Sequence, residues 1–344
     1  MSIAVSALLV AVLILLHETG HYLVARMCRM RVNRFSIGFG PAIARFRPRW
    51  SETTFQIAAI PLGGFVQIAG MDPNEPVLPG DTGSYASRPL WQRAAVIMAG
   101  PVANWVVAAA AFSLLYGIGF PKAEGGTRIG EVTEDGPAQK AGLRPGDRIL
   151  AIDGARVTRW VQVAGRTRES AGRRLVLRVR RDSEVLEIRV KPRRDRRTGQ
   201  GLIGIAPAVR LERRPGLGAI AAGARQAASD CAVLVLELAR AVTGKGVEGL
   251  MGPVGIIAMA KEQAERGLRA FVHLAGGLSV ALAVMNFLPL PALDGGRLIF
   301  LGYEVVTRRR VPPRFEAVVH WVGLLLLLAL LVLVTFRDIL VASS

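Results

Sequence analysis

Long apolar runs near both ends of the chain constrain its fold more than any other feature of the sequence. Hydrophobic residues make up 51% of the chain, and the mean hydropathy is +0.36. A helix needs about 20 mostly apolar residues to cross a bilayer. Four segments meet this requirement, at about residues 3–24, 94–120, 271–290 and 318–336. We therefore expect a membrane protein with four transmembrane α-helices.

The chain between the second and third spans is polar and rich in arginine. Within residues 127–208, apolar and polar side chains alternate in short stretches that end at turn residues, which is typical of β-strands. Residues 31–70 alternate in the same way and predict a membrane-associated β segment, at the interface or in a protein cavity, because strand edges need partners in hydrocarbon. The sequence predicts a membrane core in two halves, at residues 1–120 and 271–344. Between them lie an inserted β-rich domain at 121–212 and an amphipathic, interfacial segment at 213–270.

The many basic residues of the chain indicate which classes of partner it can bind. The formal net charge is +18, but the arginines are scattered and no aromatic residues interleave with them. This pattern argues against nucleic-acid binding and favours anionic headgroups of a lipid bilayer as the partner. The two cysteines, Cys28 and Cys231, form neither a disulfide framework nor a four-cysteine zinc site.

The placement of arginines also predicts the orientation in the membrane. Arginines crowd the loop after the first span, at 26–49, and the loop between the third and fourth spans, at 297–314. Short basic loops stay in the cytoplasm, so the N-terminus and the inserted domain are expected on the outer face. The apolar start lacks the basic n-region and the cleavage site of a signal peptide, and we interpret it as a retained helix.

The first span contains the sequence His17-Glu18-Thr19-Gly20-His21, an H-E-x-x-H motif. Residues four apart lie on one face of a helix, so both imidazoles can reach one zinc ion. The glutamate beside the first histidine can accept a proton from metal-bound water. The alternative is a polar cluster that packs against other helices without a metal, but such groups are costly to bury in a membrane without a partner.

Two histidines leave a catalytic zinc site one protein ligand short. Asp294 is the candidate, because it follows the third span and falls at a similar depth toward the cytoplasmic side. The alternative for Asp294 is a turn residue before glycine. His320, at the cytoplasmic end of the fourth span, stays open as a rival ligand, whereas His273 lies at the opposite face of the membrane.

Several motifs together resemble the site-2 protease family, in particular the bacterial regulator-of-sigma-E-type proteases. They are HETGH at 17–21, PLGGFV at 61–66, GPVANW at 100–105, NFLPLPALDGG at 286–296, and a stretch similar to a bacterial PDZ domain at 128–154. The resemblance covers almost the whole chain. It implies one inserted PDZ domain on the outer face of the bacterial cytoplasmic (inner) membrane.

The resemblance also implies roles for individual residues. His17, His21 and Asp294 would bind Zn²⁺, and Glu18 would be the general base. Asn286 and Asn104 would help to hold the substrate or intermediate, although asparagine in a membrane helix can equally join neighbouring helices. A peptide C-terminus would bind along the strand edge formed by Ile129, Gly130, Glu131 and Val132. Alternatively, the PDZ domain would only exclude large substrates by its size.

The predicted function is intramembrane zinc proteolysis of substrates with a transmembrane segment, such as an anti-sigma factor or a signal-peptide remnant. Zinc-activated water would attack the peptide bond with Glu18 as the base. One alternative is a catalytically silent membrane PDZ adaptor, which would not need the acid at Glu18. The other is a metal transporter, which would need polar residues along several spans, and the second and fourth spans have almost none.

Overall fold

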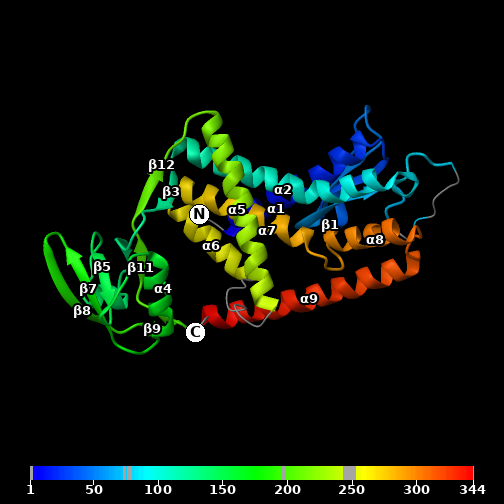
Figure 1. Cartoon of the computed structure of the whole chain (residues 1–344). Coiled ribbons are helices and arrows are strands. Elements are labelled where there is room, and N and C mark those ends of the chain that lie inside the picture. Colours follow the sequence, from blue (N-terminus) through cyan, green and yellow to red (C-terminus); the bar gives the residue numbers. More distant parts are fainter. Residues whose placement is uncertain (1–2, 73–74, 76–79, 196–198, 243–252, 344) are drawn as a thin grey trace. The chain divides into compact units, whose positions relative to one another are not determined.

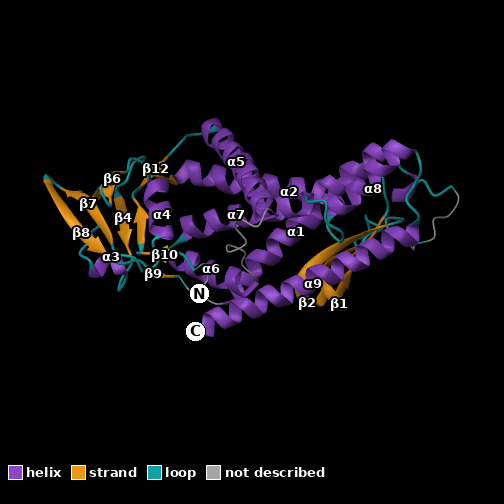
Figure 2. Cartoon of the chain, turned by 60° about the horizontal axis from the view of Figure 1, so that its bottom comes forward, coloured by secondary structure: helices purple, strands orange, loops and turns teal. Residues whose placement is uncertain are grey.

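The computed structural model describes residues 3–72, 75, 80–195, 199–242 and 253–343, and the chain forms two compact units (Figure 1). The first unit contains Met1–Tyr116 and most of the chain after Pro215. The second unit contains Gly117–Arg214. Long helices build the first unit, and short strands dominate the second (Figure 2).

Five helices of the first unit are long and apolar enough to cross a membrane, by length and composition: Ala7–Met27, Leu90–Ile118, Leu217–Arg240, Leu268–Phe287 and Pro313–Phe336. They belong to α1 (Ile3–Met27), α2 (Leu90–Ile118), α5 (Leu217–Val242), α7 (Leu268–Phe287) and α9 (Pro313–Ser343). The sequence predicted only four spans and an interfacial helix in place of α5. The predicted number of four spans is therefore not confirmed, because α5 meets the same criteria despite its charged residues.

Contacts between α1, α2 and α7 establish their relative directions. His17 and His21 of α1 contact Asn104 and Val96 of α2, so the two helices run antiparallel. Two residues of α7 contact α2. Gly276 lies against the ring of Phe112, and Ser279 donates a hydrogen bond to the carbonyl of Asn104. Because α7 is also antiparallel to α2, α1 and α7 run in the same direction.

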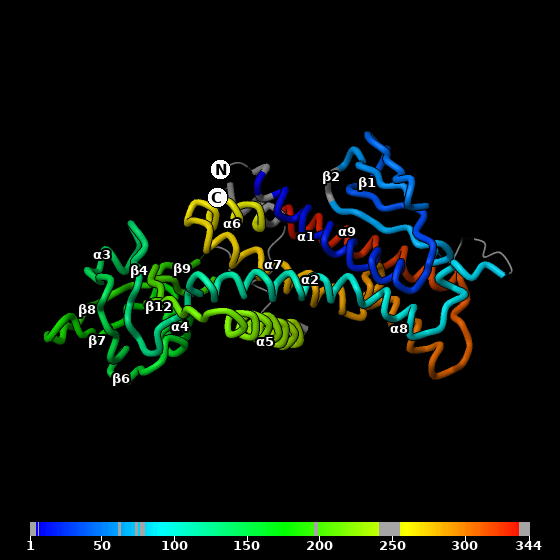
Figure 3. The backbone as a smooth tube through the Cα atoms, turned by 90° about the horizontal axis from the view of Figure 1, so that it is seen from above, coloured from blue at the N-terminus to red at the C-terminus, as the bar shows by residue number. Residues whose placement is uncertain are grey.

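The β segment expected over 31–70 consists of β1 (Val32–Phe46) and β2 (Thr54–Ile68). Both strands are long, and their pairing has several register shifts. Phe35 of β1, for example, pairs with two residues of β2, Val66 and Phe55. β2 lies against α1, as seen from above in Figure 3. Tyr22 of α1 packs its ring edge-on against Phe35 and Phe55, at centroid distances of 5.7 Å. These aromatic contacts hold the sheet beside the helix that carries the zinc motif.

Two further helices of the first unit were not predicted: α6 (Pro253–Glu265) and α8 (Asp294–Thr307). Both are too short to cross a bilayer core of about 30 Å at 1.5 Å per residue. Arg93 of α2 makes a two-armed ion pair with Glu304 of α8, at 2.9 and 2.7 Å. This buried pair ties the helix that begins at Asp294 to α2.

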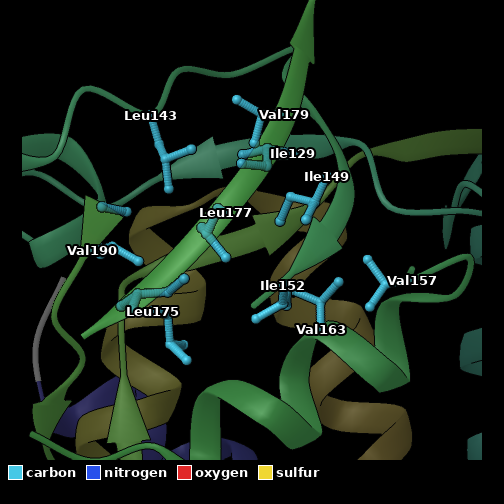
Figure 4. Close-up of a cluster of buried hydrophobic side chains, with 12 residues drawn as sticks. Ile129, Leu143, Ile149, Ile152, Val157, Val163, Leu175, Leu177, Val179 and Val190 are labelled. Atoms are coloured by element: carbon cyan, nitrogen blue, oxygen red, sulfur yellow. The ribbon is translucent and has the colours of Figure 1, made fainter. Parts of the chain in front are cut away.

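The second unit folds around a four-stranded sheet in the order β6-β5-β7-β8. These strands are β5 (Arg148–Ile152), β6 (Ala155–Arg156), β7 (Leu175–Arg181) and β8 (Glu184–Val190). Alternate residues of β7 point inward, and Leu175, Leu177 and Val179 are fully buried. They pack with Ile149 and Ile152 of β5 into the aliphatic core shown in Figure 4.

The remaining elements of the second unit complete this core. They are β3 (Phe120–Ala123), β4 (Ile129–Val132), α3 (Pro137–Lys140), α4 (Trp160–Glu169), β9 (Arg193–Arg194), β10 (Gly201–Leu202), β11 (Ile205–Pro207) and β12 (Val209–Glu212). Their pairings are β9 with β10, β4 with β11, and β3 with β12. Pairing of β3 with β12 brings the two ends of the inserted unit together.

Candidate metal centre

Three predicted metal ligands meet at one point in the first unit. The Nε2 atoms of His17 and His21 lie 3.1 and 3.2 Å from Oδ2 of Asp294, and 3.2 Å from each other. Both histidines are buried, and Asp294 is mostly buried. Two imidazole nitrogens and one carboxylate oxygen form the ligand set of a catalytic zinc site with an open fourth position. The residues therefore fit a zinc ion.

Glycines allow α1 and α2 to approach each other at this site. A Cβ added at Gly20 would lie 2.4 Å from the carbonyl oxygen of Ala99. A Cβ added at Gly100 would lie 2.3 Å from Nε2 of His21 and 2.7 Å from Nε2 of His17. Gly100 thus forms the wall of the metal site, and any side chain there would occupy the position of the ion.

The orientation of His21 is set by α2. The Nδ1–H of His21 donates to the backbone carbonyl of Val96, at 2.7 Å. This bond leaves the Nε2 lone pair of His21 free for a metal. Sequence reasoning missed this backbone partner, because no local pattern shows which carbonyl of α2 faces α1.

Asn104 is fully buried, and its amide lies 3.2 Å from Nδ1 of His17. A histidine that binds metal through Nε2 carries its proton on Nδ1, which then requires an acceptor. The Oδ1 atom of Asn104 has no hydrogen-bond partner among the described residues, and the two ends of an amide are exchangeable in assignment. When the side-chain amide of Asn104 is turned by half a rotation, its Oδ1 accepts a hydrogen bond from the Nδ1–H of His17. This geometry places Asn104 behind a metal ligand rather than against a substrate.

Glu18 lies beside the ligand cluster and is held by β2. The backbone N–H of Val66 hydrogen-bonds its carboxylate. A Cβ added at Gly64 would lie 3.4 Å from Cγ of Glu18, so the strand runs directly over this side chain. The predicted base therefore lies between the ligand cluster and β2. The PLGGFV motif indicated this segment, but not its contact with Glu18.

Asp294 is the first residue of α8 and not a simple turn residue. The N-terminus of a helix favours a negative charge, which suits an ionised carboxylate ligand. A Cβ added at Gly295 would lie 2.1 Å from the carbonyl oxygen of Leu288, and one at Gly296 would lie 2.4 Å from that of Leu290. The two glycines let α8 start directly against the end of α7.

Other predicted site residues lie elsewhere. Asn286 donates to the carbonyl of Leu282 in its own helix, at 3.0 Å, and its role with substrate stays a prediction. His273 contacts Phe112 near the N-terminal end of α7 and is not part of the ligand cluster. His320 accepts a hydrogen bond from the backbone of Ala292 and is not part of the ligand cluster.

The segment Ile129–Val132 differs from its predicted role as an open peptide-binding edge. β4 pairs with β11 along one side. On the other side, the N–H of Ile129 donates to Asp147 and its carbonyl accepts from Gly146, both at 2.8 Å. The side chain of Ile129 is buried in the core. At Ile129 both edges of β4 are therefore occupied within the chain, so an added peptide cannot pair there.

Comparisons with known proteins identify relatives over nearly the whole length of the chain. The sequence profile of Peptidase family M50 matches residues 5–330. The regulator of sigma-W protease RasP of Bacillus subtilis is 29% identical over 406 residues, which cover 95% of this chain and 95% of RasP. A protein of Nostoc sp. that is named as a zinc metalloprotease is 34% identical over 352 residues, covering 98% of this chain and 96% of its own.

Among solved structures, the PDZ domain of an SdrC-like protein from Listeria monocytogenes covers 25% of this chain and 90% of its own. It is 21% identical, and the TM-score is 0.23, a value too low to support an argument about the fold. The sequence relatives, in contrast, match nearly end to end, and two of them carry the name zinc metalloprotease. The chain therefore belongs to peptidase family M50.

Proposed function

We propose that this chain, a membrane zinc metalloprotease, cuts the membrane-spanning segments of other membrane proteins, such as an anti-sigma factor or a signal-peptide remnant. The observation that carries the proposal is the convergence of His17 and His21, on a helix with the length and polarity of a membrane span, with Asp294 at the start of α8, and Glu18 lies beside them. A peptide bond of a soluble substrate could be cut at a site on the protein surface. A site on such a helix serves a substrate that is itself in the membrane.

The residues of the site divide the chemistry between them. A bound zinc ion would polarise a water molecule and the scissile carbonyl. Glu18 accepts the proton from that water and later delivers it to the leaving amine. The Val66 N–H orients the carboxylate of Glu18. Val96 and Asn104 keep the imidazoles of His21 and His17 turned toward the ion.

The free side of β2 supports a mode of substrate binding. Val66 of β2 lies opposite Phe35 of β1, but its N–H points to Glu18 and not to β1. Because the N–H and C=O of one strand residue point to the same side, the carbonyl of Val66 also faces away from β1. Beside this strand lies a hollow of about 550 Å³, lined by Phe65–Ile68 and by residues of α9. A helical substrate must unwind before it can be cut, because its backbone groups are already paired. We expect the unwound segment to add to β2 as an extended strand.

The proposed orientation is that of a multi-pass protein of the inner membrane, with the active site toward the cytoplasm and the inserted unit outside. Basic loops support this assignment. Parallel α1 and α7 support an even number of crossings between α2 and α7. If α5 crossed the membrane, a second crossing would have to follow it, and α6, with 13 residues, is too short. We therefore propose that α5 packs against the core without a full crossing.

The inserted unit is proposed to be a PDZ-type domain that filters substrates. Its strands and its aliphatic core contribute no ligand to the metal cluster. Replacing residues 124–210 by a short linker should leave cleavage of a small transmembrane peptide intact and admit substrates with bulky outer domains. A deletion variant that inserts and holds zinc, yet cuts no peptide, would show that the unit is needed for catalysis itself.

A direct test uses the purified protein in lipid nanodiscs with a fluorogenic transmembrane peptide. Cleavage should stop when a chelator removes zinc and return when zinc is restored. A PDZ adaptor would bind the peptide without cutting it, with or without zinc. A transporter would move zinc across a sealed vesicle and leave the peptide whole. Either of these outcomes would refute the proposed protease function.

A further inference from the structure

A hydrogen bond from α9 holds the loop that carries the third metal ligand. The backbone N–H of Ala292 donates to Nδ1 of His320, at 3.0 Å. Ala292 lies two residues before Asp294, and His320 lies in the first half of α9. The last long helix of the chain is therefore joined to the ligand loop through one imidazole.

The loop needs such a restraint because Ala292 has an unfavourable backbone conformation. Its φ angle is +70°, in the left-handed region that residues with a Cβ rarely adopt. This conformation is unfavourable for a residue other than glycine, because its Cβ crowds the backbone. A strained residue next to a functional group persists only when its surroundings hold it in place. The bond to His320 is one such restraint, and it acts on the strained residue itself.

A second contact brings α9 against the same loop. A Cβ added at Gly323 would lie 2.2 Å from Cβ of Pro291, so α9 approaches the loop more closely than any side chain would allow. Gly323 lies one turn after His320 and on the same face of α9. The helix thus contacts two consecutive loop residues, Pro291 through packing and Ala292 through the hydrogen bond.

The position of the proton on His320 follows from this bond. Because Nδ1 accepts a hydrogen bond, the neutral ring carries its proton on Nε2, which lies 3.9 Å from the carboxylate of Glu316, beyond hydrogen-bond distance. Nδ1 then keeps its lone pair for Ala292. The ring also packs edge-on against Phe300 of α8, at a centroid distance of 5.6 Å. The imidazole is therefore oriented by α8 and α9 together.

We infer that His320 is a positioning residue for the zinc site: it holds Ala292 in its left-handed conformation so that Asp294 reaches the ion. This inference rests on the proposed zinc site and adds α9 to it. It also assigns a role to the residue that the sequence left open as a rival ligand. His320 uses Nδ1 for the loop, and the ligand cluster of His17, His21 and Asp294 does not include it.

The test compares zinc affinity in purified, full-length variants by competition with a chromogenic chelator. His320→Ala should weaken zinc binding by about tenfold or more, the effect typical of losing an outer partner of a metal ligand. His320→Asn should restore binding to within about threefold of wild type, because the asparagine Oδ1 can take the place of Nδ1 as acceptor. Peptide cleavage at subsaturating zinc should follow the same order.

A second variant tests the strain directly. Glycine adopts a φ of +70° without penalty, so Ala292→Gly should bind zinc as wild type does. In the double variant Ala292→Gly/His320→Ala, the loop no longer needs the restraint, and zinc affinity should recover most of the loss. A merely structural role of His320 in packing α9 would not be rescued by a glycine in the loop.

Two results would overturn the inference. One is a His320→Ala variant with wild-type zinc affinity. The other is a loss of zinc that neither His320→Asn nor the glycine variant corrects, which would fit a direct ligand or a packing role. His273→Ala is the matched control and should keep zinc. If the wild-type protein itself bound no zinc, the proposed function would fail, whereas these outcomes concern only His320.

Discussion

The metal centre and the core of the inserted unit bury their residues in opposite ways. The core of the inserted unit is aliphatic and is built from strands that follow one another in the sequence. The metal centre buries polar groups from α1, α2 and α8, and its ligands are up to 277 residues apart in the chain. Apolar burial is nondirectional, whereas a ligand set works only when each donor atom meets the same point.

This difference predicts different sensitivities to substitution. A residue of the aliphatic core contributes through area and volume, so its loss should lower the stability of one unit and leave the chemistry intact. A residue of the metal centre contributes through one atom in one position. Its replacement by a side chain of the same size should abolish function while the fold persists.

Glu18→Gln should have the largest effect on activity. The amide keeps the size of the side chain but cannot accept a proton, and loss of a general base typically costs about 10²- to 10⁴-fold in rate. Zinc content and helix content should match wild type, since Glu18 is not among the three ligands. Cleavage of a transmembrane peptide, measured beside zinc per protein, decides this. Turnover within about tenfold of wild type would remove Glu18 from this role.

Asp294→Asn should lose most of the bound zinc and, with it, the activity. A neutral amide is a poor ligand for this cation, and the change leaves the start of α8 nearly the same in shape. Metal analysis of the purified variant gives the result, with His273→Ala as a control that should stay loaded. An Asp294→Asn protein that remains fully loaded, together with an empty His320→Ala protein, would transfer the third ligand to α9.

Leu177→Ala tests the aliphatic side of the comparison. Leu177 is fully buried in β7, and such truncations cost about 2–5 kcal/mol. The loss should be confined to the inserted unit and appear as faster hydrogen exchange in β5, β7 and β8, with zinc content unchanged. Val185→Ala, at a half-exposed position on the same hairpin, should change exchange little. A loss of zinc in Leu177→Ala would show that the two units are coupled.

The smallest expected effect concerns a buried carboxylate of the inserted unit. Burial pushes the pKa of Asp147 upward, but hydrogen bonds from Arg181 and from the N–H of Arg144 outweigh it and hold the pKa below its usual range. The Asp147 pKa is lower in the folded state, so the pair stabilises the unit above the unfolded pKa of about 4. That contribution is lost as the pH falls through the folded pKa.

Arg181→Ala should therefore destabilise the inserted unit by about 1–3 kcal/mol at neutral pH. Below pH 4 or so the difference from wild type should shrink, because Asp147 becomes protonated in both proteins. Denaturant unfolding followed by protease digestion of the inserted unit measures this at each pH. A destabilisation that stays constant from neutral pH to pH 3 would mean that Arg181 acts through packing and not through its charge.

Local patterns were enough to predict several elements and the two histidines of the zinc motif, whereas Asp294 was proposed from its depth in the membrane and from the family resemblance. Spacing of four residues placed His17 and His21 on one helical face, and alternation predicted the strands of the inserted unit. The helix α8 escaped prediction because it is short and follows Pro289 and Pro291, which signal a loop. The open edge expected over Ile129–Val132 is closed at Ile129, because β11 pairs with one side of β4 and Gly146 and Asp147 bond the backbone of Ile129 on the other side.

By itself, the sequence determined that this is a membrane protein with a zinc motif and that the motif contains an acid, Glu18. These follow from side-chain chemistry and helical or strand periodicity, which act over a few residues. Only the tertiary structure decided that Val96 and Asn104 contact the histidines, that β2 runs over Glu18, and that His320 bonds the backbone of Ala292 near Asp294. Such contacts use backbone groups and distant helices. They depend on how α1, α2, β2 and α9 pack, and no local pattern encodes that packing.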